Sequence, residues 1–354
     1  MGLIHGGDIV GYIEKYGREP RLDLSANTNP LGMPEGVKEA AKQALARADC
    51  YPDPLCRRLC QAIAAWEAVP QEDILCGNGA ADLIFRLTLA ARPRRALVTA
   101  PTFAEYEQAL GLVGCQVKRH TLHLEHSFDV TERFLQDLDD TVDMVFLCNP
   151  NNPTGRLVER ALLERVLRRC EQTGALLVID ECFMELTGKA EEYTMKGRLG
   201  SKNLLLLKAF TKLFAMAGVR LGYCLTENRA LLERLRAAGQ PWSVSSLAQE
   251  AGIAALKEFE YLNKTMIVIE EAKELLLQEL GKDSQIDLLG HSANYIFFRS
   301  YIDRLEEKMA AEGILIRSCG NYAGLDHTYY RIAIKTRQAA ELFLESLRRI
   351  EAKV

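Results

Sequence analysis

The sequence has no hydrophobic run approaching the ~20 residues needed to cross a bilayer, so we do not expect a membrane-spanning chain. Its 44 lysines and arginines nearly balance its 48 aspartates and glutamates, which leaves a formal net charge of −4. This balance lacks the basic footprint of a protein that binds nucleic acid or an anionic membrane. The N-terminus has no basic region followed by an apolar core, so we expect no export and a cytoplasmic location.

Metal-binding patterns are scarce as well. Cys56 and Cys60 are four residues apart, but no second cysteine pair completes a zinc set. The ten cysteines are scattered through apolar runs, which is typical of buried free thiols in a reducing cytosol. His120, His123 and His126 lie in a strand-like stretch whose side chains alternate between two faces, so they should not converge on one ion. We therefore expect no metal site.

The sequence is long, and stretches typical of strands alternate in it with stretches typical of helices. A chain of 354 residues predicts a large domain and a smaller one. Residues 1–35 are rich in glycine and proline and are expected to form an arm. Apolar stretches of strand length then alternate with amphipathic helical stretches, which indicates an α/β fold with a mostly parallel sheet. The last third begins with long helices and ends in alternating strands and helices, including a closing helix over 337–351.

Four predicted strand ends carry polar or reactive residues. The turn at 77–82 feeds a helix N-terminus, where free amides bind anions. Asn152 follows an apolar strand in a proline-rich loop, Asp180 closes the next strand, and the run 204–212 ends in Lys212, with Arg220 in the loop beyond. Intervals of about 30 residues fit one strand–helix–strand unit each. The carboxyl ends of such strands meet on one rim, so these groups should lie together.

A lone lysine at a strand end is ordinarily a solvated surface residue. On this rim Lys212 is joined by a phosphate cradle, an amide and a carboxylate. These are the parts needed to hold pyridoxal 5′-phosphate (PLP), because the amine forms a Schiff base with the cofactor and the carboxylate keeps its pyridine nitrogen protonated. The set predicts a PLP site with Lys212 as its catalytic residue.

On these residues the sequence resembles the fold-type I PLP-dependent enzymes of the class I/II aminotransferase superfamily, over essentially its whole length. The resemblance falls in the branch that holds histidinol-phosphate aminotransferases and threonine-phosphate decarboxylases. It implies that Asp180 pairs with the pyridine nitrogen, Asn152 (before Pro153-Thr154-Gly155) with the phenolic oxygen, and Phe103 stacks on the ring. The implied ligands of the cofactor phosphate are Gly79, Ala80, Ala81, Thr211, Arg220 and, from a neighbouring subunit, Tyr51.

The resemblance also implies an architecture. It is a large PLP-binding domain at 36–235 with a mostly parallel seven-stranded sheet, and a smaller α+β domain at 236–354. The arm, residues 1–35, would contribute to the small domain and the substrate site. Since Tyr51 would serve the neighbouring site, the expected unit is a homodimer.

Two positions depart from the family pattern. The family often has Ser or Thr three residues before the lysine as a phosphate ligand, where this sequence has Ala209. Aminotransferases of this branch usually have Tyr three residues after the aspartate, where this sequence has Phe183. One phosphate contact and one hydrogen bond to the phenolic oxygen are therefore expected to be absent or replaced.

Phe183 is similar to the decarboxylase side of the branch, as are the stretches 5–8, 241–244 and 316–325. The resemblance implies a carbon–carbon lyase that converts L-threonine O-3-phosphate to (R)-1-amino-2-propanol phosphate for cobalamin biosynthesis. His5 and Arg317 would hold the phosphate, an imidazolium and a guanidinium suited to a dianion, and Arg331 the carboxylate. Gly6, Asn29 and Asn152 complete the implied substrate site.

Two alternatives remain open. One is transamination by a histidinol-phosphate-type aminotransferase, because the residues alone do not fix which bond at the substrate Cα is broken. The other is a non-catalytic PLP-binding sensor domain. Such a domain usually accompanies a DNA-binding module, and no basic helix-turn-helix segment precedes residue 20.

Overall fold

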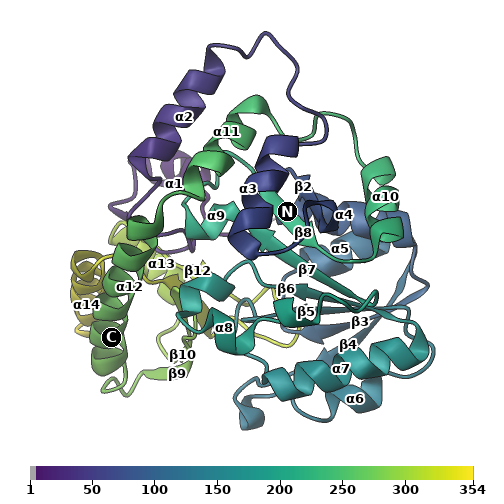
Figure 1. Ribbon diagram of the computed structural model, residues 1–354. Coiled ribbons are helices and arrows are strands. Elements are labelled where there is room, and N and C mark those ends of the chain that lie inside the picture. The colour runs from purple at the N-terminus through teal and green to yellow at the C-terminus, as the bar shows by residue number, and fades with distance from the viewer. Residues whose placement is uncertain (1–4, 354) are drawn as a thin grey trace.

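The computed structural model describes residues 5–353, so residues 1–4 of the predicted arm lie outside the described part. Its largest sheet has seven strands in the order β2-β8-β7-β6-β5-β3-β4 (Figure 1). The strands are β2 (Ile74–Gly77), β3 (Arg95–Ala100), β4 (Gln116–Thr121), β5 (Met144–Cys148), β6 (Leu176–Asp180), β7 (Leu204–Ala209) and β8 (Gly222–Leu225). β8 runs antiparallel to both its neighbours and the other pairs are parallel. The expected mostly parallel seven-stranded sheet is confirmed.

The central strands are buried on both faces, which explains their near-continuous apolar sequences. Successive residues point to opposite faces, so Leu204 and Leu206 join one core cluster while Leu205 and Leu207 join another. Helices α3 (Arg57–Glu67), α6 (Phe134–Asp137) and α7 (Arg160–Thr173) cover the first face, and α4 (Gly79–Ala91), α5 (Glu105–Leu112) and α10 (Arg229–Ala238) cover the second (Figure 1). The sheet is thus the middle layer of a three-layer α/β unit.

The helices of this part of the chain follow the predicted amphipathic stretches. The longer ones are α2 (Glu35–Leu45), α3 (Arg57–Glu67), α4 (Gly79–Ala91), α5 (Glu105–Leu112), α7 (Arg160–Thr173), α10 (Arg229–Ala238) and α11 (Ser246–Ala255). The short ones are α6 (Phe134–Asp137), α8 (Ala190–Tyr193), α9 (Phe210–Leu213), η1 (Gln71–Asp73), η2 (Leu124–His126), η3 (Met184–Thr187) and η4 (Lys196–Arg198). No helix within residues 5–353 is long and apolar enough to cross a membrane.

A second sheet lies in the C-terminal third and is antiparallel, in the order β12-β13-β10-β9. Its strands are β9 (Ile286–Gly290), β10 (Tyr295–Ser300), β12 (Arg317–Ser318) and β13 (Tyr329–Ala333), and its helices are α12 (Phe259–Leu280), α13 (Leu305–Ala311) and α14 (Arg337–Glu351). The closing helix is the one predicted from the sequence. Helices α12 and α14 pack against each other at the end of the molecule that holds the C-terminus (Figure 1).

The N-terminal arm joins the two sheets. After α1 (Ile9–Tyr16), strand β1 (Leu22–Asp23) pairs in parallel with β11 (Ile314–Leu315). The Ala333 N–H then donates to Leu24 O (2.7 Å), and the Asn29 N–H donates to Lys212 O (3.0 Å). The arm therefore connects the small sheet to the end of β7. The domain boundaries at residues 35 and 235 stay a prediction.

Candidate active site

The loops that carry the predicted site residues leave neighbouring strands. In the sheet register Cys148 of β5 is opposite Asp180 of β6, and Asp180 is opposite Leu207 of β7. The loop with Asn152, the end of β6 and the turn with Lys212 therefore start side by side on one rim.

Lys212 does not end a strand as expected. β7 stops at Ala209, which pairs with Gly222, and Lys212 lies in the short helix α9. The helical turn begins there because the Phe210 N–H donates to Leu221 O (3.2 Å) as the last cross-strand contact, after which the chain coils. The prediction of a strand running to Lys212 was wrong, but the lysine still follows the carboxyl end of β7.

The Lys212 amine has cations around it and no ion-pair partner within the described residues. Within the described residues Nζ has no hydrogen bond or ion pair, and it lies 5.4 Å from the centroid of the Phe183 ring. Burial, helped by the nearby guanidinium of Arg331, lowers the pKa of Lys212 to about 8. An amine with this pKa is partly neutral at physiological pH and can act as a nucleophile.

Asp180 is buried and held by two donors. The Tyr106 hydroxyl donates to Oδ2 (2.7 Å), and the Cys182 N–H donates to Oδ1 (3.0 Å). The Tyr106 ring is stacked on Phe146 and meets Phe103 edge-on. Sequence reasoning missed Tyr106, although its position three residues after Phe103 at a helix start places the two rings on neighbouring turns.

The turn between β2 and α4 forms an anion cradle. Gly79 has a φ of +82°, and a Cβ there would lie 2.8 Å from Nη2 of Arg220, so the guanidinium packs directly over the glycine. Asn78 donates its side-chain amide to Ser243 O (3.0 Å) instead of capping the helix. The first amides of α4, including those of Ala80 and Ala81, have no carbonyl partner in their own helix and are available to bind an anion.

Arg331 and Asn152 form the second polar group of the rim. Nη1 of Arg331 donates to Asn152 Oδ1, and Nη2 donates to Ser25 O (3.0 Å). The Tyr322 hydroxyl reaches the same Asn152 oxygen at 3.5 Å. Nε of Arg331 is buried without a hydrogen-bond partner among the described residues. The guanidinium thus lies fixed between the arm and the β5 loop.

His5 and Asn321, the hydrogen-bond partner of Arg317, line a neighbouring cavity. Arg317 donates to Ser318 O (2.6 Å) and to Asn321 Oδ1 (2.8 Å). His5 Nε2 is 2.7 Å from Oε1 of Glu105, a residue that sequence reasoning did not select. His5, Asn321 and Tyr322 line a cavity of about 130 Å³. Arg331 acts on Lys212, and Arg317 lies opposite Arg331 on the neighbouring strand, so the two guanidiniums suit two separate anions.

The remaining predicted residues lie outside this cluster or are engaged in packing. Asn29 donates its amide to Leu213 O (2.7 Å) and Thr265 Oγ1 (2.8 Å), which favours holding the Lys212 turn over contacting a substrate. A Cβ on Gly6 would lie 2.2 Å from Ser25 O, so the arm packs closely at this glycine. Thr211 is half-buried beside Lys212 in α9. Tyr51 is 81% exposed, and its ring packs against Trp242 at 4.6 Å.

The three histidines also differ from expectation. His120 lies in β4, but His123 and His126 follow the end of that strand, so strand alternation does not separate them. His120 Nδ1 is instead 2.7 Å from Asp137 Oδ2. Within residues 5–353 no group of three His, Cys, Asp or Glu side chains is arranged to hold a metal ion.

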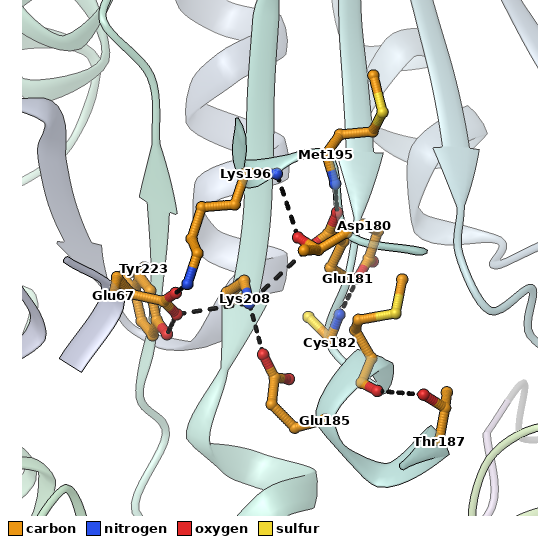
Figure 2. A network of polar contacts seen from close by, with 12 residues as sticks. Glu67, Asp180, Glu181, Cys182, Glu185, Thr187, Met195, Lys196, Lys208 and Tyr223 are labelled. Carbon is orange, nitrogen blue, oxygen red and sulfur yellow. Dashed lines mark hydrogen bonds and ion pairs between the residues drawn. The ribbon is translucent and has the colours of Figure 1, made fainter. Parts of the chain in front are cut away.

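A buried charge network surrounds Lys208 of β7 and includes Glu181, which follows the end of β6 (Figure 2). Lys208 Nζ is 2.5 Å from Glu185 Oε1, 3.4 Å from Glu67 Oε1 and 3.7 Å from Glu181 Oε2. Burial alone would lower the pKa of Lys208, but the three carboxylates raise it above its usual value. Lys208 is therefore a permanent cation.

The acids of the network are held from several elements. Tyr223 of β8 donates to Glu67 Oε1 (2.5 Å), and Lys196 of η4 is 3.3 Å from Glu67 Oε2. Glu181 accepts from the Thr194 hydroxyl (2.7 Å), and burial raises its pKa. The network ties α3, β6, β7, β8 and the 181–196 loop together directly behind the rim (Figure 2).

The rim fits PLP on its own chemistry. The unpaired amine of Lys212 can bond an aldehyde, and Asp180 presents a carboxylate held in place by two donors. The Gly79 cradle under Arg220 leaves no room for a side chain and presents amides to a phosphate. Phe103 and Asn152 lie on the loops between these groups.

Comparison with known proteins agrees with this fit. Residues 19–347 match the family described as aminotransferase class I and II. The chain is 37% identical to a threonine-phosphate decarboxylase of Salmonella typhimurium over 98% of its own length and 96% of that protein. It is 33% identical to a putative threonine-phosphate decarboxylase of Caldanaerobacter subterraneus, over 97% and 93%.

Among solved structures, the histidinol-phosphate aminotransferase of Clostridium acetobutylicum superposes with a TM-score of 0.88 at 30% identity, covering 94% of this chain and 100% of that one. Family and fold thus agree with the residues on the rim. The chain belongs to the aminotransferase class I and II family of PLP-dependent enzymes.

Proposed function

We propose that this protein decarboxylates L-threonine O-3-phosphate to (R)-1-amino-2-propanol phosphate, a step of cobalamin biosynthesis. The observation that carries the proposal is the pair of buried arginines beside Lys212, Arg331 on Asn152 and Arg317 with His5 nearby. The proposed substrate has two anionic groups, a carboxylate and a phosphate, that match them. The 37% identity to a threonine-phosphate decarboxylase over nearly the whole chain supports the same substrate.

In this proposal the rim holds PLP with the residues expected from the sequence. Lys212 carries the cofactor, and Asp180 faces its pyridine nitrogen, with Tyr106 and the Cys182 amide holding the carboxylate. The other proposed contacts are Asn152, Phe103, Gly79, Ala80, Ala81, Thr211 and Arg220. Ala209 offers no hydroxyl, so the Arg220 guanidinium and the α4 amides carry most of the phosphate binding.

PLP, when bound, withdraws electrons from the bonds at the substrate Cα. The chain supplies binding and orientation. Arg331 and Asn152 bind the carboxylate end, while Arg317 and His5 bind the phosphate end. Fixing both ends sets the torsion at Cα and therefore which bond is broken. When CO₂ leaves, Cα must take up one proton, and Lys212 Nζ is the amine placed to deliver it.

Phe183 supports a role other than transamination. Its ring lies 5.4 Å from Lys212 Nζ and meets Tyr295 edge-on, so an apolar wall stands where branch aminotransferases usually carry a tyrosine hydroxyl. The site therefore has one polar contact fewer beside the reacting lysine.

We further infer a homodimer in which Tyr51 reaches the partner's cofactor phosphate. Tyr51 and Trp242 form an exposed aromatic pair, which is a typical interface feature. Light scattering on the PLP-loaded protein should give twice the chain mass of 39.6 kDa. A monomer with full activity would contradict this inference.

The second candidate is a histidinol-phosphate-type aminotransferase. The histidinol-phosphate aminotransferase of C. acetobutylicum favours it, because that structure superposes on this chain with a TM-score of 0.88 and the two sequences are 30% identical. Histidinol phosphate would use the Arg317 side for its phosphate but has no carboxylate for Arg331.

The deciding experiment is incubation of the PLP-loaded protein with threonine phosphate without any 2-oxoacid. The proposal predicts release of CO₂ and formation of aminopropanol phosphate, seen by mass spectrometry, with Lys212→Ala as the inactive control. Product formation that depends strictly on a 2-oxoacid acceptor would reject decarboxylation in favour of transamination.

A further inference from the structure

Glu105 is a buried acid that contacts His5 of the cavity lining, and neither cofactor binding nor substrate binding as proposed uses it. It begins α5, two residues after Phe103, and is 8% exposed. Oε1 lies 2.7 Å from His5 Nε2, and Oε2 is buried with no hydrogen-bond partner among the described residues. Burying an ionised carboxylate is costly unless it is paired with an opposite charge. Its contact with His5 therefore needs a functional explanation.

His5 lies in surroundings that disfavour its charged form. Burial and the nearby cations Arg317, Lys212 and Arg331 lower the pKa of His5. A neutral imidazole has one N–H and one lone pair. If Nε2 carries the hydrogen toward Glu105, Nδ1 offers a lone pair, which repels a phosphate oxygen. Without a neighbouring group that favours its protonated form, His5 is a poor partner for a dianion.

We propose that Glu105 is a positioning residue for His5: its carboxylate binds Nε2–H, keeps the ring an imidazolium and leaves Nδ1–H to donate to the substrate phosphate. The inference rests on the proposed function, which assigns the phosphate to His5 and Arg317. It adds the residue that makes the histidine selective for a phosphorylated substrate.

The charges around Glu105 fit this role. Burial raises the pKa of Glu105 to about 7, and Asp180 acts in the same direction, whereas Arg317 and Lys212 oppose them. Near neutral pH the Glu105–His5 pair therefore shares one proton. A phosphate dianion draws that proton onto His5, so phosphate affinity should fall as the pH rises through the range in which the pair deprotonates.

The direct test uses isopropyl phosphate, which has neither an amine nor a carboxylate. It is titrated calorimetrically into the PLP-loaded protein at several pH values. Glu105→Gln should weaken its binding about tenfold or more at pH ~7.5, the size expected for losing a charged hydrogen bond. The fall of affinity with pH should also move to lower pH, and Glu105→Asp, which keeps the carboxylate, should recover part of the loss.

The matched control is Glu125→Gln. Glu125 also pairs with a histidine, His126 (3.5 Å), but the pair lies at an exposed position away from the cavity. This variant should bind isopropyl phosphate like the wild type. Thermal unfolding of all variants checks that each is folded.

Kinetics add a readout that a structural role would not give. Glu105→Gln should raise KM for threonine phosphate about tenfold or more with little change in kcat. It should leave KM for unphosphorylated threonine unchanged. Because Glu105 acts through His5, combining Glu105→Gln with His5→Gln should cost little more than His5→Gln alone.

The outcomes separate the two proposals. If His5→Gln weakens isopropyl phosphate binding and Glu105→Gln does not, the positioning role is wrong and the phosphate assignment stands. Equal losses for both threonine substrates also overturn the positioning role. If neither the wild type nor His5→Gln distinguishes phosphorylated from unphosphorylated ligands, the proposed phosphate site fails and takes the inference with it.

Discussion

Lys208 and Lys212 stand within one short stretch at the end of β7, and their surroundings are opposite. Lys208 is bonded to Glu185 and flanked by Glu67 and Glu181, which hold its pKa above the usual value (Figure 2). Lys212 has no ion pair within the described residues, and burial lowers its pKa to about 8. The same side-chain type is therefore a fixed cation at one position and a partly neutral amine at the other.

The difference lies in which groups face each amine. The loop after β6 turns Glu181 and Glu185 toward Lys208, while Asp180 is held by Tyr106 and Cys182. Pairing makes a buried lysine inert and anchors the strands. Leaving Lys212 without an ion pair makes it reactive, at the expense of burying an unpaired amine. The Lys208 network thus stabilises the strands whose ends carry Asp180 and the unpaired Lys212.

Removing the reactive amine should have the largest effect. Lys212→Ala should lower turnover by about three orders of magnitude or more, because nucleophile and proton carrier are lost together. The midpoint of thermal unfolding should not fall, since the amine satisfies no partner. The exposed Lys202→Ala is the control. Retention of more than a few per cent of activity would place the reaction on another residue.

Removing the charge of Lys208 should lower stability and leave activity largely unchanged. Lys208→Met removes the cation that three acids share, although Glu67 keeps Lys196, and should cost about 3–5 kcal/mol of unfolding free energy in urea titrations. Activity per folded molecule should change little. Adding Glu185→Gln to Lys208→Met should recover part of the stability, because one unpaired acid is removed. Loss of activity without loss of stability would show that Lys208 takes part in the chemistry.

The two lysines should also differ in pH dependence. Between pH ~8 and 10.5 an unfolded chain keeps a proton that the folded Lys212 has lost, so PLP-free protein should gain stability as the pH rises. The gain is about 1–3 kcal/mol at most. Lys212→Met should remove it, as measured by urea unfolding across this range. Lys208, with a raised pKa, contributes stability below the unfolded pKa and loses it only at higher pH. A wild-type curve with the same pH dependence as that of Lys212→Met would contradict the lowered pKa.

The smallest expected effect concerns Tyr106, which donates a hydrogen bond to Asp180. Tyr106→Phe removes one hydrogen bond to the Asp180 carboxylate but leaves the one from the Cys182 N–H, so it should lower turnover about three- to tenfold, equivalent to roughly 1 kcal/mol. Tyr301→Phe is the matched control, because Tyr301 donates to Asp287 at the same 2.7 Å distance on the exposed surface. Equal behaviour of the two variants would mean that Asp180 does not need Tyr106.

The residues of the rim could be predicted from the sequence, because each of them directly follows an apolar run that marks a buried strand. A buried strand is an apolar run, and the residues after its carboxyl end must lie at the sheet edge, so Asn152 and Asp180 could be placed by counting strands. Lys212 was placed on the correct edge but in the wrong element. The switch to α9 depends on where β8 stops pairing, and a local pattern does not contain that information.

The pairings between distant residues could not be predicted. Glu67 of α3 meets Lys208, His5 meets Glu105, and Tyr106 meets Asp180 only after helices have packed on the sheet. A helix can turn several residues toward a given strand, and sequence spacing does not say which one. The same holds for Asn29, whose packing against the Lys212 turn became visible only in the fold.

The most direct test of the account is to locate the covalent attachment of PLP. The PLP-loaded protein is reduced with borohydride and digested, and the modified peptide is identified by mass spectrometry. The contrast between the two lysines predicts a single pyridoxyl group on Lys212 and an unmodified Lys208. Modification of Lys208, or of another lysine with Lys212 unmodified, would contradict it.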